Sequence, residues 1–327
     1  MAILSAAGER TLYTTRFRLM GGTGVVRFVD DRGRDAATRI ARAAEAEALR
    51  IEWKFSRFRE ASVVSEINRN AGRTPVAVDD ETIGLVEAAL AMARVSGGRF
   101  DPTVGVMRRA WKLAEARVPD AAEIAALLPL VDHGAVGVRN GTVFLRRAGM
   151  ELDLGGVGKE YAVDRVADLL VAEGVASALV NFSGDVRTVG GRGDGRPWSI
   201  GVVDPRARDR CRFAVRVAGT AGIATSGDYE RFFVADGVRY HHLLDARTGW
   251  PARGVASATV VAANALMAGR IATIAFLSGM EEGIRTVESF PGAEGALIDE
   301  RGAIVATSGM SRLSDLPGSL YASYPGI

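Results

Sequence analysis

The sequence predicts an α+β fold in which residues 1–327 form one compact domain, with a helical N-terminal portion and a strand-rich central and C-terminal portion. Three observations support this prediction. Apolar residues recur at helical spacing early in the chain, whereas short apolar runs alternate with glycine turns after Leu152. Hydrophobic residues make up 48% of the 327 positions, which is enough for a large core. No internal repeat or low-complexity linker divides the chain.

Four long helices are expected, each from an amphipathic or apolar pattern bounded by polar residues or glycine. The first carries Ile40 and Phe55 on its apolar side, and Asp79 or Asp80 is placed to cap the second. The FDPTVG segment after the second helix places Asp101 on a loop. The predicted ranges are 34–57, 81–95, 159–174 and 265–277.

Short strands separated by glycine turns are expected in the second half of the chain. Their signal is a run of apolar and β-branched residues that ends at glycine, aspartate or proline. The segments are LDLGG, SALVNFSGD, WSIGVVDP, RFAVRV, GIATSGDY, RYHHLL and ASATVVA.

Charge and cysteine content exclude several classes of protein. The 41 basic residues nearly balance the 39 acidic ones, so the net charge of +2 gives no field suited to nucleic acid or an anionic membrane. The single cysteine, Cys211, excludes an intrachain disulfide. Glu9 and Arg10 interrupt the N-terminal apolar run, and the longest later run contains Arg270. We therefore expect a cytoplasmic protein with no membrane partner.

A pair of histidines is the first candidate for chemistry. His241 and His242, two of the three histidines, lie side by side in YHHLLDARTG, close to Asp245. Neighbouring side chains in a strand point to opposite faces, so at most one of the two enters a given pocket. A histidine beside a carboxylate can accept a proton near neutral pH. Two structural histidines are the alternative.

Glycine-rich turns near this segment favour an anionic ligand. GIATSGDY offers the hydroxyls of Thr225 and Ser226 together with backbone amides. DLGGVGK, residues 153–159, leads into a helix whose N-terminal amides can receive phosphate. NFSGD, residues 181–185, ends another strand in polar residues. One such turn is a weak signal, whereas these turns and the histidine segment in this order form a strong one.

With these segments the chain resembles the FAD:protein FMN transferases, the ApbE-like family, over almost its entire length. Eight blocks match in order: RFRLMGGTG, FSRFREASVVSEIN, GGRFDPTVGVMRRAW, DLGGVGKEYAVDRVADLL, ALVNFSGDVRTVG, WSIGVVDP, GIATSGDYERFF and YHHLLDARTG. The resemblance implies that FAD binds in a cleft, that Mg²⁺ coordinates its pyrophosphate, and that FMN passes to a Thr or Ser hydroxyl of an acceptor flavoprotein with release of AMP.

The resemblance also implies roles for individual residues. His242 is similar to the family histidine of the transfer step, where a base draws the proton from the acceptor hydroxyl. The backbone carbonyl of Gly158 and the side chain of Thr273 are similar to ligands of the metal. The residues implied to line the FAD site are Met20, Asp101, Asp153, Lys159, Asn181, Ser183, Gly184 and Asp185, with Thr225 and Ser226 near the phosphates.

The chain departs from the family pattern at the metal. Family members carry Ala-Asp-Ala-Leu-Ala-Thr here, whereas this chain reads Ala-Gly-Arg-Ile-Ala-Thr over residues 268–273 and lacks the carboxylate at Gly269. Mg²⁺ prefers anionic oxygen ligands, so the loss should weaken the site. Arg270 could neutralise the pyrophosphate instead, or Asp228 or Asp245 could complete the site. A third alternative is flavin binding without catalysis.

A second departure lies in the glycine-rich turn. The family usually has Ala-Lys-Gly where this chain has Gly-Lys-Glu over residues 158–160. The carboxylate of Glu160 is unfavourable near a pyrophosphate unless it faces solvent or contacts a metal. Three functions therefore remain at this stage: an FMN transferase, a non-catalytic FAD-binding or regulatory protein, and an FAD pyrophosphatase.

Overall fold

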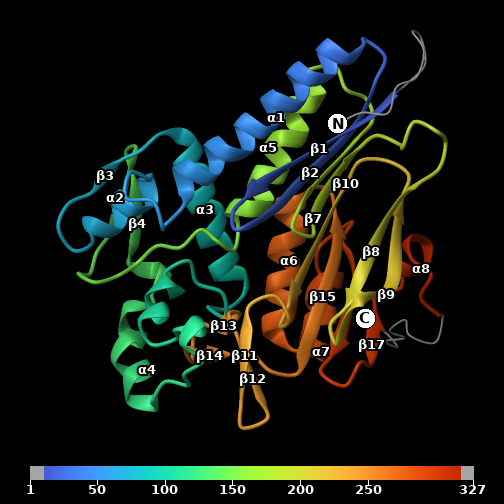
Figure 1. Ribbon diagram of the computed structural model, residues 1–327. Coiled ribbons are helices and arrows are strands. Elements are labelled where there is room, and N and C mark those ends of the chain that lie inside the picture. The colour runs from blue at the N-terminus through green and yellow to red at the C-terminus, as the bar shows by residue number, and fades with distance from the viewer. Residues whose placement is uncertain (1–10, 318–327) are drawn as a thin grey trace.

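The centre of the protein is an eight-stranded antiparallel sheet, seen in a computed structural model that describes residues 11–317 (Figure 1). Its strand order is β1-β2-β6-β7-β10-β15-β16-β17. Every neighbouring pair in this order is antiparallel. The bounds are β1 Thr11–Leu19, β2 Gly22–Asp30, β6 Ala178–Phe182, β7 Asp185–Val189, β10 Ala221–Gly227, β15 Val255–Ala262, β16 Glu294–Asp299 and β17 Ile304–Ala306.

The two faces of this sheet are covered by different elements. Because side chains alternate along a strand, Val180 and Val260 join one core while their neighbours Leu179 and Val261 join another. The first core also contains the buried faces of α1 (Arg34–Phe55), α5 (Gly158–Ala172), α6 (Ala265–Ser278) and α7 (Met280–Glu288). The second lies beneath the hairpin of β8 (Trp198–Asp204) and β9 (Ala207–Val217). The first core draws residues from Phe17 to Leu297.

The four predicted helices are present with nearly the predicted bounds. They are α1 Arg34–Phe55, α3 Asp80–Val95, α5 Gly158–Ala172 and α6 Ala265–Ser278. Asp79 caps α3 by accepting a hydrogen bond from the backbone N–H of Thr82. The further helices are α2 Val63–Arg69, α4 Ala121–Leu127, α7 Met280–Glu288 and α8 Met310–Leu313, with short 3-10 turns at Val104–Arg109, Leu113–Glu115, Leu128–Leu130 and His133–Ala135.

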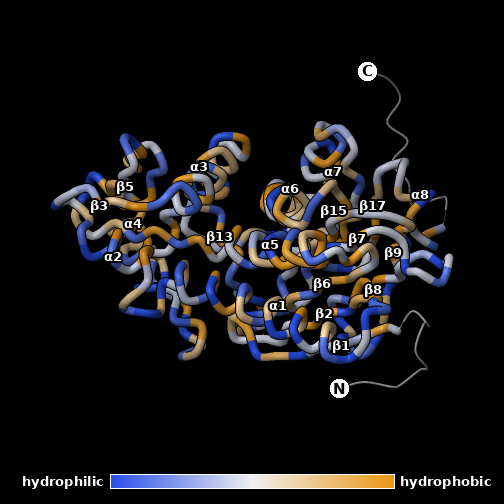
Figure 2. The backbone as a smooth tube through the Cα atoms, turned by 90° about the horizontal axis from the view of Figure 1, so that it is seen from above, coloured by the Kyte–Doolittle hydropathy of each residue, from blue (hydrophilic) through white to orange (hydrophobic). Residues whose placement is uncertain are grey.

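A second region lies beside the main sheet. It contains α2, α3 and α4 and a small sheet of β3 (Val76–Ala77), β5 (Thr142–Leu145) and β4 (Val136–Arg139) (Figure 2). Two short hairpins approach it: β11 Phe232–Ala235 with β12 Val238–His241, and β13 Leu244–Asp245 with β14 Trp250–Pro251. Their aromatic side chains pack on Trp111, which meets Tyr240 in a tilted arrangement and Trp250 edge to face. The histidine segment is therefore held where the two regions meet.

Three sequence predictions about strands need correction. The described chain opens with the β1–β2 hairpin, so two strands precede the helical N-terminal portion. LDLGG forms no strand, because the backbone of Leu152 bonds to the Asn68 side chain and the N–H of Asp153 donates to Pro102. The strand predicted over RYHHLL ends at His241, which leaves His242 just beyond β12.

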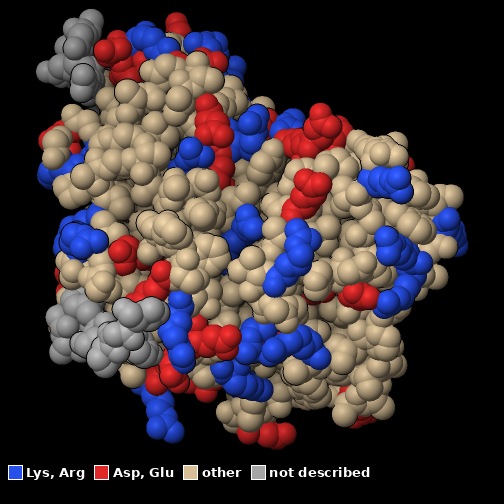
Figure 3. Space-filling model, turned by 180° about the vertical axis from the view of Figure 1, so that it is seen from behind, with Lys and Arg blue, Asp and Glu red and all other residues tan. Residues whose placement is uncertain are grey.

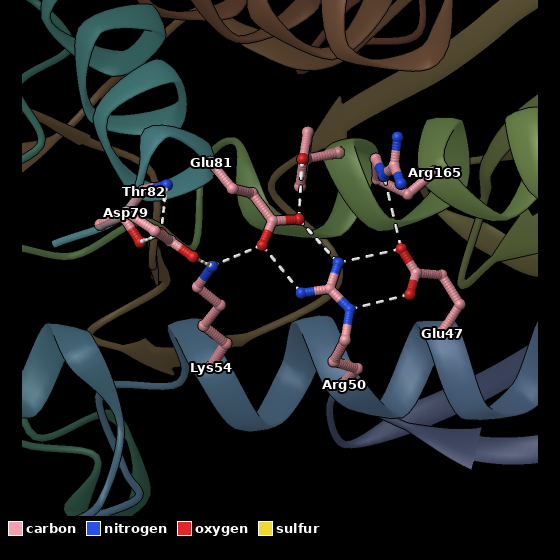
Figure 4. A network of polar contacts seen from close by, with 8 residues as sticks. Glu47, Arg50, Lys54, Asp79, Glu81, Thr82 and Arg165 are labelled. Carbon is pink, nitrogen blue, oxygen red and sulfur yellow. Dashed lines mark hydrogen bonds and ion pairs between the residues drawn. The ribbon is translucent and has the colours of Figure 1, made fainter.

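A network of charged side chains joins α1, α3 and α5 on one side of the molecule (Figure 4). Arg50 of α1 contacts Glu47 of its own helix and Glu81 of α3, and Lys54 contacts Glu81 and Asp79. The hydroxyl of Tyr161 on α5 donates to Glu81 at 2.9 Å. This network fixes the first turn of α5 relative to α1 and α3.

Basic and acidic side chains are interspersed on the molecular surface. On the face in Figure 3, Lys and Arg side chains lie next to Asp and Glu over a largely uncharged background. Among residues 11–317, no helix combines the length and the apolar character needed to cross a membrane.

Candidate active site

The glycine-rich turn before α5 is held by a set of polar contacts. Asp153 accepts a hydrogen bond from the N–H of Gly155 at 2.9 Å and pairs with Arg57 at 2.8 Å. Gly156 packs against the ring of Phe100, and a Cβ atom there would lie 2.8 Å from that ring. The tight turn therefore requires glycine, and it places Lys159 and Glu160 in the first turn of α5.

Two buried carboxylates, Glu160 and Asp185, lie beside the partly buried side chain of Lys159 at the start of α5. Lys159 forms an ion pair of 2.7 Å with Asp185, the first residue of β7, and the Asp185 side chain is only 3% exposed. Asp185 also accepts a hydrogen bond from the backbone of Thr225. Burial and the neighbouring Asp185 carboxylate raise the pKa of Glu160. The Glu160 residue is 8% exposed, and its Oε2 atom has no hydrogen-bond partner among the described residues.

Glu160 lies directly against Gly269, the position at which the resemblance predicts an aspartate. A Cβ atom built on Gly269 would lie 2.5 Å from Cγ and 2.7 Å from Oε1 of Glu160. Real Cβ atoms do not approach other heavy atoms this closely. The side chain of Glu160, reaching across from α5, therefore fills the space that a side chain at position 269 of α6 would need.

The hydroxyl groups of β10 face α6 and β15. Ser226 and Thr273 are joined by a hydrogen bond of 3.0 Å, and Thr225 and Thr259 by one of 2.9 Å. Gly222 lies so close to the start of α6 that a Cβ atom there would be 2.0 Å from the backbone of Asn264. This close approach brings the helix that carries Gly269 and Thr273 onto the strand that carries Ser226.

Two hairpin turns lie beside each other at the edge of this group. Met20 and Gly21 connect β1 to β2, and Ser183 and Gly184 connect β6 to β7, all four with positive φ. The turns touch, because a Cβ atom on the next residue, Gly22, would lie 2.1 Å from Oγ of Ser183. Among the residues implied to line the FAD site, the structure thus brings Met20 and Ser183 together.

Asn181 stabilises the second of these turns. Its side-chain oxygen accepts a hydrogen bond from the N–H of Gly184 at 2.9 Å. This contact places Asn181 beside the turn that leads directly into Asp185. The NFSGD segment therefore connects the hairpin turns to the buried pair of Asp185 and Lys159.

The two neighbouring histidines have different environments, because His241 ends β12 whereas His242 lies beyond it. His241 is 3% exposed, and its Nε2 atom lies 2.9 Å from the carbonyl of Ala252. His242 is half-buried, with Nδ1 3.3 Å from the carbonyl of Arg231. Burial lowers the pKa of His242 to about 3, and the positive charge of Arg231 adds to this effect. His242 is therefore neutral at physiological pH.

The predicted carboxylate partner of the histidines is not beside them. Asp245 instead binds Arg247 at 2.8 Å and Arg99 at 3.3 Å. Asp228 is bound by both terminal nitrogens of Arg206, at 2.7 and 2.8 Å. Both aspartates are thus paired with arginine, which argues against their completing a metal site.

Asp101 has a different environment from the other predicted site residues. Its carboxylate accepts hydrogen bonds from the N–H and hydroxyl of Thr103 and from the N–H of His133. Its second oxygen also lies 2.8 Å from Nδ1 of His133. These contacts satisfy the carboxylate within the protein and make Asp101 an anchor for its loop.

Three further residues belong to this region but were not singled out as site residues in the sequence. Arg57 pairs with Asp153, Arg231 supplies the carbonyl next to His242, and Asp164 connects α5 to the start of α6. Each lies inside a family-like block, in FSRFRE, ERFF and AVDRV respectively. Their roles depend on contacts distant in sequence, which a local pattern does not reveal.

The described residues contain no cluster of His, Cys, Asp and Glu side chains of the kind that binds a metal ion. Among residues 11–317, no three His, Cys, Asp or Glu side chains gather in a way that could hold a metal ion. A surface hollow at the end of α1, lined by residues such as Trp53 and Arg59, includes none of the site residues. The candidate site is defined by the contacts among α5, α6, β7 and β10, and the ring of His241 packs edge to face on Phe276 of α6.

Comparison with known proteins gives a consistent result. A family model described as the ApbE family matches residues 20–298. An FAD:protein FMN transferase of Treponema pallidum is 35% identical over 277 residues, 79% of this chain and 76% of the relative. One from Klebsiella pneumoniae is 34% identical over 276 residues, 81% of this chain and 85% of the relative.

Solved structures show the same fold. The crystal structure of the ApbE protein from Thermotoga maritima matches with a TM-score of 0.84 and 37% identity, covering 92% of this chain and 99% of that one. The flavin transferase ApbE from Vibrio cholerae matches with a TM-score of 0.82 and 26% identity, covering 93% and 100%.

Proposed function

The chain belongs to the ApbE family of FAD:protein FMN transferases, and we propose that its own site transfers FMN from FAD to a Thr or Ser hydroxyl of an acceptor flavoprotein. The observation that carries this proposal is the convergence of the predicted residues around the first turn of α5, where Lys159, Asp185 and Thr225 are in contact. In the reaction the hydroxyl oxygen bonds to the phosphorus of the FMN portion, and AMP leaves.

On the donor side, the start of α5 is suited to a pyrophosphate. The first N–H groups of a helix have no partner within the helix, and its dipole favours negative charge there. Lys159 adds a positive charge, and Asp185 holds it in place at 2.7 Å. We assign Asp153, Lys159, Asn181, Ser183, Gly184, Thr225 and Ser226 to this donor site, with Met20 at its edge.

We also propose that the site holds Mg²⁺, using the carbonyl of Gly158 and the hydroxyl of Thr273. Oxygen donors are what Mg²⁺ requires, and a buried carboxylate oxygen without a hydrogen-bond partner, Oε2 of Glu160, lies in this part of the protein. When bound, the ion would neutralise negative charge on the pyrophosphate.

On the acceptor side, His242 is the candidate base. If its Nδ1 atom carries the proton and donates to the carbonyl of Arg231, then Nε2 is the nitrogen with a free lone pair. This tautomer can take the proton of the acceptor hydroxyl as its oxygen attacks. The depressed pKa of His242 keeps the ring in this neutral form.

Transfer assays with an acceptor flavoprotein from the same organism test this function. Incubation with FAD and Mg²⁺ should give a fluorescent, FMN-modified acceptor and release AMP, and His242→Asn should lower the rate by at least about a hundredfold while FAD still binds. An acceptor whose Thr or Ser hydroxyl is removed serves as the control. AMP released equally with this control would indicate an FAD pyrophosphatase, and bound FAD without any AMP would indicate a non-catalytic protein.

The cytoplasmic location stays a prediction. Cell fractionation followed by immunoblotting tests it directly.

A further inference from the structure

Positions 160 and 269 are complementary in space. Position 269, on α6, has no side chain, and the side chain of Glu160, on α5, occupies the volume next to it. The contact is close, since Oε1 of Glu160 lies 2.7 Å from the point where a Cβ atom at 269 would be. The carboxylate that the family pattern expects from α6 is thus matched by one that arrives from α5.

This carboxylate is buried and lacks a counter-charge of its own. Glu160 is 8% exposed, and its Oε2 atom has no hydrogen-bond partner among residues 11–317. The nearby ammonium group, Lys159, is already paired with Asp185 at 2.7 Å. Two buried carboxylates thus share one partly exposed ammonium group, which leaves one negative charge to be balanced. Burying an uncompensated charge is costly, so a cation or a proton must balance it.

The position of Glu160 favours a cation. Thr273 follows Gly269 by four residues, so the two lie on the same face of α6. Gly158, whose carbonyl is the other proposed ligand, lies two residues before Glu160. The other acidic residues considered for the site, Asp228 and Asp245, are paired with arginine. Arg270, the alternative source of positive charge at the pyrophosphate, has no ion-pair partner among the described residues, Glu160 included, and burial lowers its pKa.

We propose that Glu160 supplies the carboxylate ligand of the divalent-cation site, replacing a ligand from position 269. This inference rests on the proposed function, because that function is what calls for a cation at the pyrophosphate. The chain thus retains a carboxylate at its metal site, carried by a different helix.

Reciprocal substitution tests the proposal. Binding of Mn²⁺, a paramagnetic substitute for Mg²⁺, is measured by the electron paramagnetic resonance signal of the free ion, in protein saturated with FAD. Glu160→Gln keeps the size of the side chain and should weaken Mn²⁺ binding by at least about tenfold. The double variant Glu160→Gly with Gly269→Asp should recover binding to within about threefold of the original protein. Glu87→Gln, an exposed change on α3 with the same loss of charge, is the matched control and should bind as the original does.

The single variant Gly269→Asp provides an independent check on the geometry. Its new side chain would overlap Glu160, so we expect a lower melting temperature than that of the double variant. Circular dichroism establishes which variants fold. If Glu160→Gln does not fold, the proposal is decided by Mn²⁺ binding of the double variant compared with that of the original protein.

Several results would overturn the inference. They are Mn²⁺ binding by Glu160→Gln equal to that of the original protein, a folded double variant that binds no better than Glu160→Gln, or no Mn²⁺ binding by the original protein. If a proton shared between Glu160 and Asp185 balances the charge instead of a cation, Glu160→Gln should bind Mn²⁺ as the original protein does, or the original protein should bind none. Failure of the proposed function looks different: Mn²⁺ binds through Glu160, but no FMN reaches an acceptor.

Discussion

His242 shows how one side chain acquires its chemical state from its surroundings. The imidazole lies next to the charged side chain of Arg231 and is half-buried, so protonating it would place a second positive charge in a poorly solvated position. Its Nδ1 atom faces the carbonyl of Arg231 at 3.3 Å. A neutral ring with a defined tautomer is the form that a proton acceptor requires.

The first prediction concerns this ring. NMR spectra of histidine side chains, recorded from pH 8 to pH 4, should show no titration of His242, because burial lowers its pKa to about 3. The signal is assigned by its loss in His242→Asn. A midpoint near the ordinary histidine value of about 6.5 would contradict the structure.

At the scale of single residues, the contact between Gly269 and Glu160 could not be predicted from the sequence. The resemblance to the family predicts a missing carboxylate at Gly269, and Glu160 is visible in the sequence as a second departure. Nothing local in the sequence indicates that the two positions touch, because that contact depends on how α5 packs against α6. Taken separately, Gly269 removes a carboxylate from the expected metal site and Glu160 adds a negative charge near the expected pyrophosphate.

Among secondary-structure elements, α5 organises its neighbour α6. The Asp164 carboxylate accepts hydrogen bonds from the N–H groups of Ala265 and Leu266, each at 2.9 Å, and so caps α6 from another helix. Asp164 also pairs with Arg187 of β7 at 3.1 Å. One helix therefore carries Glu160 and, one turn later, the side chain that fixes the start of α6.

The second prediction tests this cap. Asp164→Ala should lower the free energy of unfolding by about 2 to 4 kcal/mol, because it removes a cap and leaves Arg187, whose side chain is only 17% exposed, with one partner fewer. The control is Asp168→Ala on the same helix. Asp168 contacts the same arginine, but its side chain is 50% exposed, so the loss should be about 1 kcal/mol or less. Urea denaturation measures both, and equal losses would show that the cap contributes nothing.

The elements themselves were predictable to different degrees. Helices α1, α3, α5 and α6 follow from apolar periodicity and from glycine or polar residues at their ends. The LDLGG segment has the composition of a strand, but its backbone bonds to the Asn68 side chain, from a different part of the chain. The β1–β2 hairpin was missed as secondary structure, although its MGGTG turn was matched to the family.

For the molecule as a whole, the charged network of Figure 4 connects the helical region to the sheet region. It involves Arg50 and Lys54 on α1, Glu81 on α3 and Tyr161 on α5. Hydrogen bonding by Arg50, with further hydrogen bonds from Lys54 and Tyr161, lowers the pKa of Glu81 to about 2. These pairs are partly exposed, so each contributes no more than about 1 kcal/mol.

The third prediction concerns acid stability. A carboxyl group whose pKa is lower in the folded state stabilises the fold fully above its unfolded pKa, here near 4.5. That contribution is lost as the pH falls from about 4.5 toward 2. Glu81→Gln should therefore lower the melting temperature at pH 7 and flatten its decline below pH 4.5. The exposed Glu87→Gln is the control, and a Glu81→Gln curve parallel to that of the original protein would refute this role.

The contact between Glu160 and position 269 also limits how such a sequence can evolve. A chain with Asp at 269 and Glu at 160 has two side chains in one volume, and a chain with glycine at both positions has no carboxylate there. An exchange of one arrangement for the other by single substitutions passes through one of these two combinations. We therefore expect the two positions to change together among relatives, so that lineages divide into two groups with few mixed members. A search that requires an aspartate at position 269 would discard this chain.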